Sequence, residues 1–182
     1  MNTGKSVGQD THALGYRFGR GSLWFRVVLL GLLTLAMGAR ANDVDWLTLN
    51  QDFASQRHVD LDGIDRSNLQ RLKPICEARL NEPAWFGSGI VKVGRRLFVT
   101  TLRATYAIDA VNCKPLWRSL VEFKYPVASY FATRGVGYDK GVVYRGTNDG
   151  QLLALDAATG KTLWSIQAAD SSQRESLVAA PV

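Results

Sequence analysis

Cysteine and histidine, the residues most often used as zinc ligands and in nucleophilic triads, are scarce in this sequence. Its 182 residues include two cysteines, Cys76 and Cys113, and two histidines, His12 and His58. This scattered set makes a poor zinc site and gives little support for nucleophilic catalysis. The glycine-containing stretches "GRGSLW" and "RGVGYDKG" lack the strand-to-helix context and the lysine-serine ending of phosphate-binding loops, so neither is predicted to bind a nucleotide.

Residues 1–41 are typical of a secretory signal peptide. Basic residues precede the apolar run 27–37, and Ala39 and Ala41 fit an A-x-A cleavage site. The run is too short to span a bilayer comfortably, because a span needs about 20 residues. We therefore predict export to an oxidising compartment. The alternative is an uncleaved anchor helix, which would leave the protein associated with the membrane.

The distribution of charge argues against a nucleic-acid partner. The formal net charge is +6, from 22 Lys and Arg against 16 Asp and Glu. Residues 1–41 hold five of the bases and one of the acids, so the remaining 17 bases and 15 acids give the rest of the chain only +2. A phosphate-binding patch should lie on the folded domain. We therefore expect no nucleic acid among the partners.

Export determines how the two cysteines are interpreted. An even pair in an oxidising compartment predicts a disulfide between Cys76 and Cys113. Such a bond would close a long loop and contribute about 3 to 4 kcal/mol on the loop-entropy account. The alternative is two separate buried thiols.

The elements that must position these residues fall into two parts. Residues 42–82 are irregular, except that "DRSNLQRL" predicts a short helix with Asp65 as N-cap and Pro74 as its end. From residue 83 onward, short apolar runs alternate with glycine and polar pairs, without helical periodicity. We therefore predict an all-β fold class with a short helical lead-in.

The strongest architectural signal is an internal repeat. Six residues recur at an offset of 47. In the first copy they are Ala107, Asp109, Ala110, Lys114, Leu116 and Trp117, and in the second Ala154, Asp156, Ala157, Lys161, Leu163 and Trp164. In the second copy Thr159 and Gly160 complete a turn, where glycine can take a positive φ. The first copy has Asn112 and Cys113 at these positions. Such a repeat in an all-β chain predicts one four-stranded propeller blade per copy, the alternative being a chance echo of two hairpins.

The second copy resembles the tryptophan docking motif, A-x-D-x-x-T-G-x-x-x-W, of the pyrroloquinoline quinone (PQQ) enzyme repeat. It fits every fixed position, with Ala154, Asp156, Thr159, Gly160 and Trp164, and the first copy fits three. The lead-in is also similar to that of the family, with a tryptophan, a "QRH" element and an I-x-x-x-N-x-x-x-L helix before the first blade. The resemblance covers residues 44–182 and points to PQQ-dependent alcohol and sugar dehydrogenases, without specifying a substrate.

The resemblance implies an eight-bladed β-propeller that holds PQQ and a calcium ion on its axis. It also implies oxidation of alcohols or aldose sugars in the periplasm, with cytochrome c or a membrane quinone as electron acceptor. Arg134 matches an arginine that contacts the cofactor in the family, and PQQ carries carboxylates that a guanidinium can bind. The alternative is a surface arginine paired with Asp139 or Glu122.

Other positions depart from the family pattern. Ala128 and Ser129 stand where some methanol-oxidising members have adjacent cysteines, and no residue of "WFGSGIVKV" matches the glutamate before their first blade strand. Val178 occupies the place of a threonine that contacts the cofactor. Some relatives also carry cysteines near positions 76 and 113. These departures bear on the chemistry more than on the fold.

The predicted organisation is a signal peptide at 1–41, a lead-in at 42–82, and two blades with the start of a third at 83–182. We expect the chain to be the N-terminal part of a longer dehydrogenase and to be inactive alone, with the calcium ligands and the catalytic carboxylate beyond Val182. A competing hypothesis is a non-catalytic propeller that acts as a scaffold in envelope protein assembly. A degenerate remnant without a role of its own is a third hypothesis.

Overall fold

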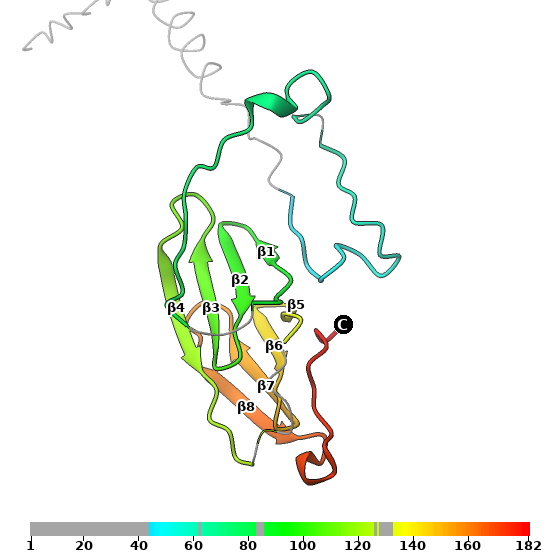
Figure 1. The fold of residues 1–182 in the computed structure, drawn as a ribbon, viewed down its shortest axis with the longest axis vertical. Helices are drawn as coiled ribbons and strands as arrows, with labels where there is room; N and C mark the ends of the chain where they lie inside the picture. The colour runs from blue at the N-terminus through cyan, green and yellow to red at the C-terminus, as the bar shows by residue number, and fades with distance from the viewer. Residues whose placement is uncertain (1–43, 62, 83–85, 126, 128–132) are drawn as a thin grey trace, which may run out of the picture. The chain divides into compact units, whose positions relative to one another are not determined.

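Two four-stranded antiparallel sheets dominate the computed structural model, which describes residues 44–182 except 62, 83–85, 126 and 128–132 (Figure 1). The first sheet contains β1 (Val91–Val93), β2 (Arg96–Thr100), β3 (Ala104–Asp109) and β4 (Pro115–Leu120), in that order. The second contains β5 (Gly137–Asp139), β6 (Val142–Gly146), β7 (Gln151–Asp156) and β8 (Thr162–Gln167). The all-β prediction is confirmed.

The predicted signal peptide lies outside the described residues, together with its apolar run. Within the part of the chain that the structure describes, no helix has the length and apolar character needed to cross a membrane.

Alternation along the strands gives the two sheets a shared core. Phe98 of β2 and Val143 of β6 are fully buried in it, because side chains on one face of each sheet point toward the other sheet. The buried members of this core are Val91, Phe98, Ala107, Val136, Val143, Leu153, Leu155 and Ala157. An apolar cluster therefore forms part of the contact between the sheets.

The opposite face of the first sheet is covered by the lead-in. Val99, Tyr106 and Ile108 are buried there, and Ala78 and Leu80 of the lead-in pack against them. The disulfide between Cys76 and Cys113 holds this segment in place, with a Cα–Cα distance of 5.7 Å. The predicted disulfide is confirmed, and it ties the lead-in to the turn that follows β3.

The helix predicted over "DRSNLQRL" is shorter than expected. Only a 3-10 helix, η2 (Leu69–Arg71), forms, preceded by a turn in which Asp65 Oδ1 accepts hydrogen bonds from the amides of Ser67 and Asn68. Leu69 and Leu72 stay 57% and 56% exposed, so neither packs an apolar helix face against the sheets. A helix this short is marginal without such packing.

The repeat residues join the first sheet to the second. Trp117 Nε1 donates a hydrogen bond to the carbonyl of Ala157 at 3.1 Å. Gly160 lies so close to the indole that a Cβ at this position would be 2.5 Å from Trp117 Cε3. The register shifts just after the repeat's alanine in both sheets, at Ala107 and at Ala154. The two copies therefore share local geometry as well as sequence.

The last residues of the chain run along the second sheet, beside β5 and β6 (Figure 1). Leu177 N donates to the carbonyl of Thr147 at 3.0 Å. A Cβ at Gly137 would clash with the carbonyl of Pro181, and one at Gly146 with that of Leu177, so these glycines permit the close approach.

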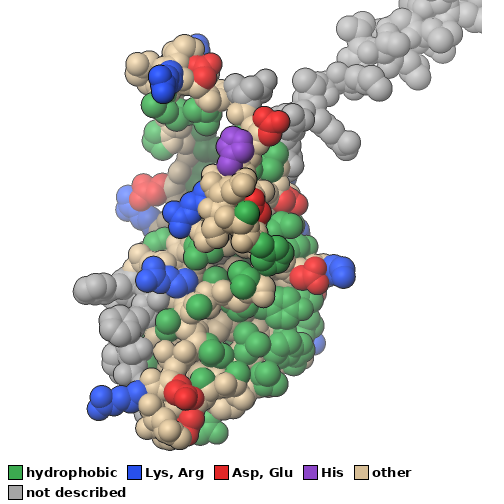
Figure 2. All heavy atoms as spheres, turned by 90° about the vertical axis from the view of Figure 1, so that its right-hand side faces the viewer, with side chains coloured by type: hydrophobic (Ala, Val, Ile, Leu, Met, Phe, Trp, Pro, Cys, Tyr) green, Lys and Arg blue, Asp and Glu red, His purple; other side chains and the backbone are tan. Residues whose placement is uncertain are grey.

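The surface carries both apolar and charged side chains. In Figure 2, hydrophobic side chains gather over one side of the molecule, whereas Lys and Arg are dispersed. Strand β8 contributes large exposed hydrophobic residues, namely Leu163, Trp164 and Ile166.

Candidate functional site

Arg134 lies where the approach to β5 meets the approach to β1. Gly89 N donates to the Arg134 carbonyl at 2.9 Å, and Arg134 N donates to the carbonyl of Val178 at 2.7 Å. Gly135 has a φ of 118°, and a Cβ there would be 2.9 Å from the carbonyl oxygen of Gly89. The backbone of Arg134 is thus held by hydrogen bonds on both sides, next to a position that only glycine fits.

The side chain of Arg134 is exposed at this edge. Among the described residues, its guanidinium forms no hydrogen bond and no ion pair, so the alternative pairing with Asp139 or Glu122 is not formed there. A planar guanidinium without a partner can donate two parallel hydrogen bonds to a carboxylate. The chemistry of this edge therefore suits an anionic ligand.

Three further residues were linked by the sequence to the same site, namely Ala128, Ser129 and Val178. Val178 is brought next to Arg134, since its carbonyl accepts the Arg134 amide hydrogen bond. Ala128 and Ser129 lie outside the described residues. Within the described part of the chain, no group of three or more His, Cys, Asp or Glu side chains could hold a metal ion.

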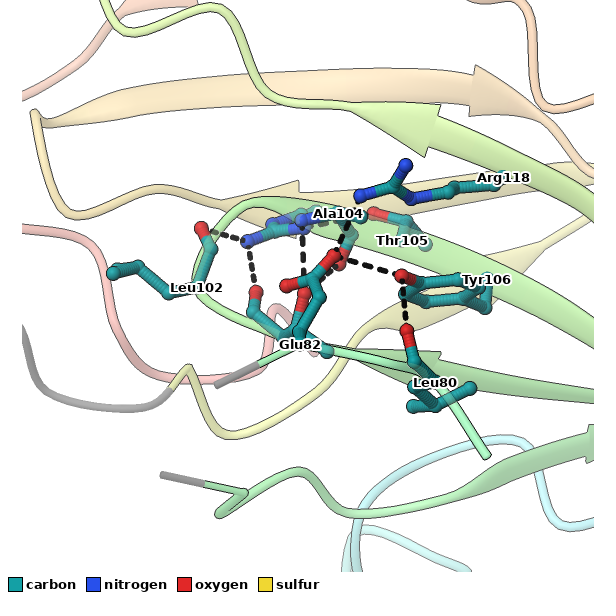
Figure 3. Close-up of polar contacts among 9 residues, drawn as sticks. Leu80, Glu82, Leu102, Ala104, Thr105, Tyr106 and Arg118 are labelled. Carbon is teal, nitrogen blue, oxygen red and sulfur yellow. Dashed lines mark hydrogen bonds and ion pairs between the residues drawn. The ribbon is translucent and has the colours of Figure 1, made fainter. Parts of the chain in front are cut away.

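A second polar cluster, which the sequence did not predict, joins the lead-in to both sheets (Figure 3). The carboxylate of Glu82 accepts hydrogen bonds from the Tyr106 hydroxyl at 2.7 Å and from Arg118 Nη2 at 2.9 Å. The Arg118 guanidinium also lies 5.7 Å from the centre of the Tyr106 ring. Glu82 therefore anchors the lead-in to β3 and β4.

Arg145 of β6 extends the cluster across to the second sheet. Its side chain is fully buried, and Nη2 donates to the carbonyls of Thr101 and Leu102 at 2.6 and 3.0 Å. Nη1 donates to Thr105 Oγ1 at 3.1 Å. These bonds cross from the second sheet to the β2–β3 connection and to β3 of the first sheet, so a buried cation holds the two sheets together.

The protonation of the cluster follows from its burial and hydrogen bonds. Burial by itself would raise the pKa of Glu82, but hydrogen bonds from Thr101, Tyr106 and Arg118 outweigh it and leave that pKa below its usual 4.5. Burial lowers the pKa of Arg145 to about 10, against the attraction of the Glu82 carboxylate. Both groups are therefore charged at neutral pH, and the cluster is held together by charge-assisted hydrogen bonds.

The sequence held a signal for this cluster in the alternation of β6. Val143 and Arg145 share the face that points to the first sheet, so an arginine stands where the pattern calls for an apolar residue. A buried cation in such a position needs carbonyl or carboxylate partners. The identity of those partners came only from the structure.

Comparison with known proteins gives several relatives that are named as methanol or alcohol dehydrogenases. The chain is 30% identical over 175 aligned positions to the lanthanide-dependent methanol dehydrogenase of Methylacidiphilum fumariolicum, covering 85% of this chain and 28% of that protein. It is 35% identical over 127 positions to the dehydrogenase subunit of the quinone-type alcohol dehydrogenase of Gluconacetobacter polyoxogenes, covering 67% and 17%. The chain therefore spans less than a third of the length of these relatives.

A solved structure agrees. The quinohemoprotein alcohol dehydrogenase ADHIIG from Pseudomonas putida superposes with a TM-score of 0.71 and 26% identity, over 79% of this chain and 23% of that one. The two sheets thus match part of a PQQ dehydrogenase propeller. The family described as "PQQ: Glucose/ethanol/alcohol dehydrogenase, beta-propeller domain" matches residues 46–165, about two thirds of the sequence, and this chain belongs to that family.

Proposed function

We propose that this chain is the N-terminal part of a periplasmic, PQQ-dependent dehydrogenase that oxidises alcohols or aldose sugars. The observation that carries the proposal is Arg134, an exposed cation without a partner among the described residues. Its backbone is held by hydrogen bonds to Gly89, before β1, and to Val178. Membership of the PQQ dehydrogenase family gives this cation a ligand class.

Among the described residues, Arg134 is the one that we propose contacts the cofactor. The Arg134 guanidinium would bind a PQQ carboxylate, and Gly89 and Gly135 keep the adjoining backbone free of side chains. When bound, PQQ supplies the two-electron oxidation that no side chain of this protein can perform.

The remaining parts of the proposal rest on the family. Calcium would act as a Lewis acid beside the cofactor, with ligands from parts of the full-length protein outside this chain. The propeller would have eight blades, and electrons would leave to cytochrome c or a membrane quinone. The isolated 182-residue chain would then show no activity.

The test uses the full-length gene product supplied with PQQ and calcium. We expect saturable PQQ binding and reduction of an electron-accepting dye with a panel of alcohols or aldoses. Arg134→Ala should weaken PQQ binding by about tenfold or more, the loss of one charge-assisted interaction. Lys161→Ala, which removes an exposed cation from the turn before β8, is the matched control and should have no effect.

Two results would overturn parts of the proposal. Absence of both PQQ binding and dye reduction would leave the non-catalytic envelope scaffold as the better hypothesis. Dye reduction by residues 1–182 alone would contradict the proposed division of the active site.

A further inference from the structure

Three hydroxyl groups form a chain immediately beside Arg134. Thr133 Oγ1 donates to Thr100 Oγ1 at 2.8 Å, and Thr100 Oγ1 donates to Ser88 Oγ at 3.1 Å. Ser88 Oγ donates in turn to the carbonyl of Gly89 at 2.7 Å and accepts from Thr100 N at 2.9 Å. We call Ser88, Thr100 and Thr133 the hydroxyl relay.

The relay connects the same segments that meet at Arg134. Ser88 precedes Gly89, whose amide binds the Arg134 carbonyl. Thr100 is the last residue of β2, and Thr133 is the neighbour of Arg134 in the chain. The relay therefore links the approach to β1, the end of β2 and the approach to β5 through side chains, in parallel with the backbone bonds.

Burial makes Thr100 and Thr133 depend on each other for hydrogen bonds. Thr100 and Thr133 are each 1% exposed, so water cannot replace a missing partner. Removal of the Thr133 hydroxyl would take away the hydrogen bond that Thr100 Oγ1 accepts and leave it only the bond to Ser88, and a lost hydrogen bond in a buried site costs stability. Donors aligned in one direction also strengthen one another.

We propose that the hydroxyl relay positions Arg134 for its ligand, with Thr133 as the main positioning residue. This inference rests on the proposed contact between Arg134 and PQQ. If the segment around Arg134 were loose in the free protein, binding would carry the cost of ordering it, and the apparent affinity would fall by the fraction of molecules already ordered. The relay keeps that fraction high.

The experiment compares three threonine variants of the full-length gene product. Thr133→Val removes the hydroxyl and keeps the shape, and Thr133→Ser restores a hydroxyl. Thr105→Val is the matched control, because Thr105 is also 1% exposed and its hydroxyl also bonds across the two sheets, to Arg145. Two quantities are measured: the dissociation constant of PQQ by fluorescence titration with calcium present, and amide hydrogen exchange at Gly89 and Arg134 in the cofactor-free protein.

Thr133→Val should raise the dissociation constant about fivefold, which corresponds to one neutral hydrogen bond. It should also speed exchange at Gly89 and Arg134. Thr133→Ser should return both quantities to the wild-type values, and Thr105→Val should leave both unchanged although it also lowers stability. If Thr133→Val does not yield folded protein, Ser88→Ala interrupts the relay at its less buried end and replaces it in the comparison.

Three outcomes contradict the inference: unchanged exchange in Thr133→Val, faster exchange with an unchanged dissociation constant, or an equal loss of affinity in Thr105→Val. An unchanged dissociation constant in Arg134→Ala would instead overturn the proposed contact between Arg134 and PQQ. The failure of the relay and the failure of the proposed function are therefore distinguishable.

Discussion

The two copies of the repeat place the same tryptophan in different surroundings. Trp117 is partly buried, donates to the carbonyl of Ala157 and lies against Gly160 of the second sheet. Trp164 stands at the same point of the second copy and is 42% exposed, with the Tyr144 ring at 6.0 Å. The residue and its local pairing are the same, so the neighbouring sheet decides how much the tryptophan stabilises.

The turns of the two copies have the same backbone conformation but different residues at the equivalent position. Gly160 takes a φ of 72° and leaves room for an indole, whereas Cys113 takes a φ of 57° and bonds to Cys76. Both residues adopt the left-handed conformation that the turn requires, but only glycine does so without steric cost. In the first copy, a covalent bond to the lead-in takes the place of a docked tryptophan.

Among the largest expected effects is a difference in stability loss between substitutions of the two tryptophans. Trp117→Ala should lower the free energy of unfolding of the 182-residue chain by about 3 kcal/mol, because it removes a partly buried aromatic packed against the core together with its hydrogen bond. Trp164→Ala should cost about 1 kcal/mol, since much of its surface already faces water. Urea denaturation measures both, and equal losses would show that the neighbouring sheet is not what distinguishes them.

Loss of the disulfide should have an effect of similar size. The double variant with Cys76→Ser and Cys113→Ser should lower the free energy of unfolding by about 3 to 4 kcal/mol. Without the disulfide, the unfolded chain is less restricted and gains conformational entropy. Cys76→Ser with Cys113→Gly should recover about 1 kcal/mol of that loss, because glycine relieves the positive φ at this turn. No difference between the two double variants in urea denaturation would mean that the first turn stores no backbone strain.

Gly160→Ala tests the other turn. The added Cβ would lie 2.5 Å from Trp117 Cε3 and must also adopt a φ of 72°, so we expect a loss of about 2 to 3 kcal/mol. Gly94→Ala is the control, since Gly94 has a φ of 52° with open space around it and should lose only about 1 kcal/mol. Equal thermal shifts for the two variants would exclude the contact with Trp117 as the cause.

The smallest effect concerns the hydrogen bonds of Glu82, which hold the lead-in to the first sheet. Glu82→Gln should cost about 2 kcal/mol at neutral pH, because its hydrogen bonds to Tyr106 and Arg118 lose their charge. Glu77→Gln is the control, since Glu77 pairs with Arg79 on the exposed surface and should change little.

Glu82 also predicts how stability depends on pH. Its pKa is lowered in the folded state, so its contribution is fully present above the usual value of 4.5 and is lost as the pH falls through the folded-state pKa. Glu82→Gln should therefore flatten the acid limb of the stability curve below about pH 4.5. An unchanged acid limb in urea titrations at several pH values would contradict this role.

The sequence predicted features that depend on local pattern. The strands follow from alternation, the turn at Gly160 from its residue types, and the disulfide from two cysteines in a chain expected to be exported. It overestimated the helix near Asp65, because no tertiary surface covers Leu69 and Leu72. It gave no indication that Glu82 and Arg145 belong to one cluster, since they meet only after both sheets and the lead-in have packed.

By itself, then, the sequence determined the family, the two repeated sheets and the arginine most suited to an anionic ligand, since these depend on residue type and spacing along the chain. Only the tertiary structure decided which tryptophan packs against the neighbouring sheet, which residue joins the two sheets, and which hydroxyls bond beside Arg134. Those outcomes depend on contacts between residues far apart in the chain. Their energies are set by burial and distance, which a linear pattern does not contain.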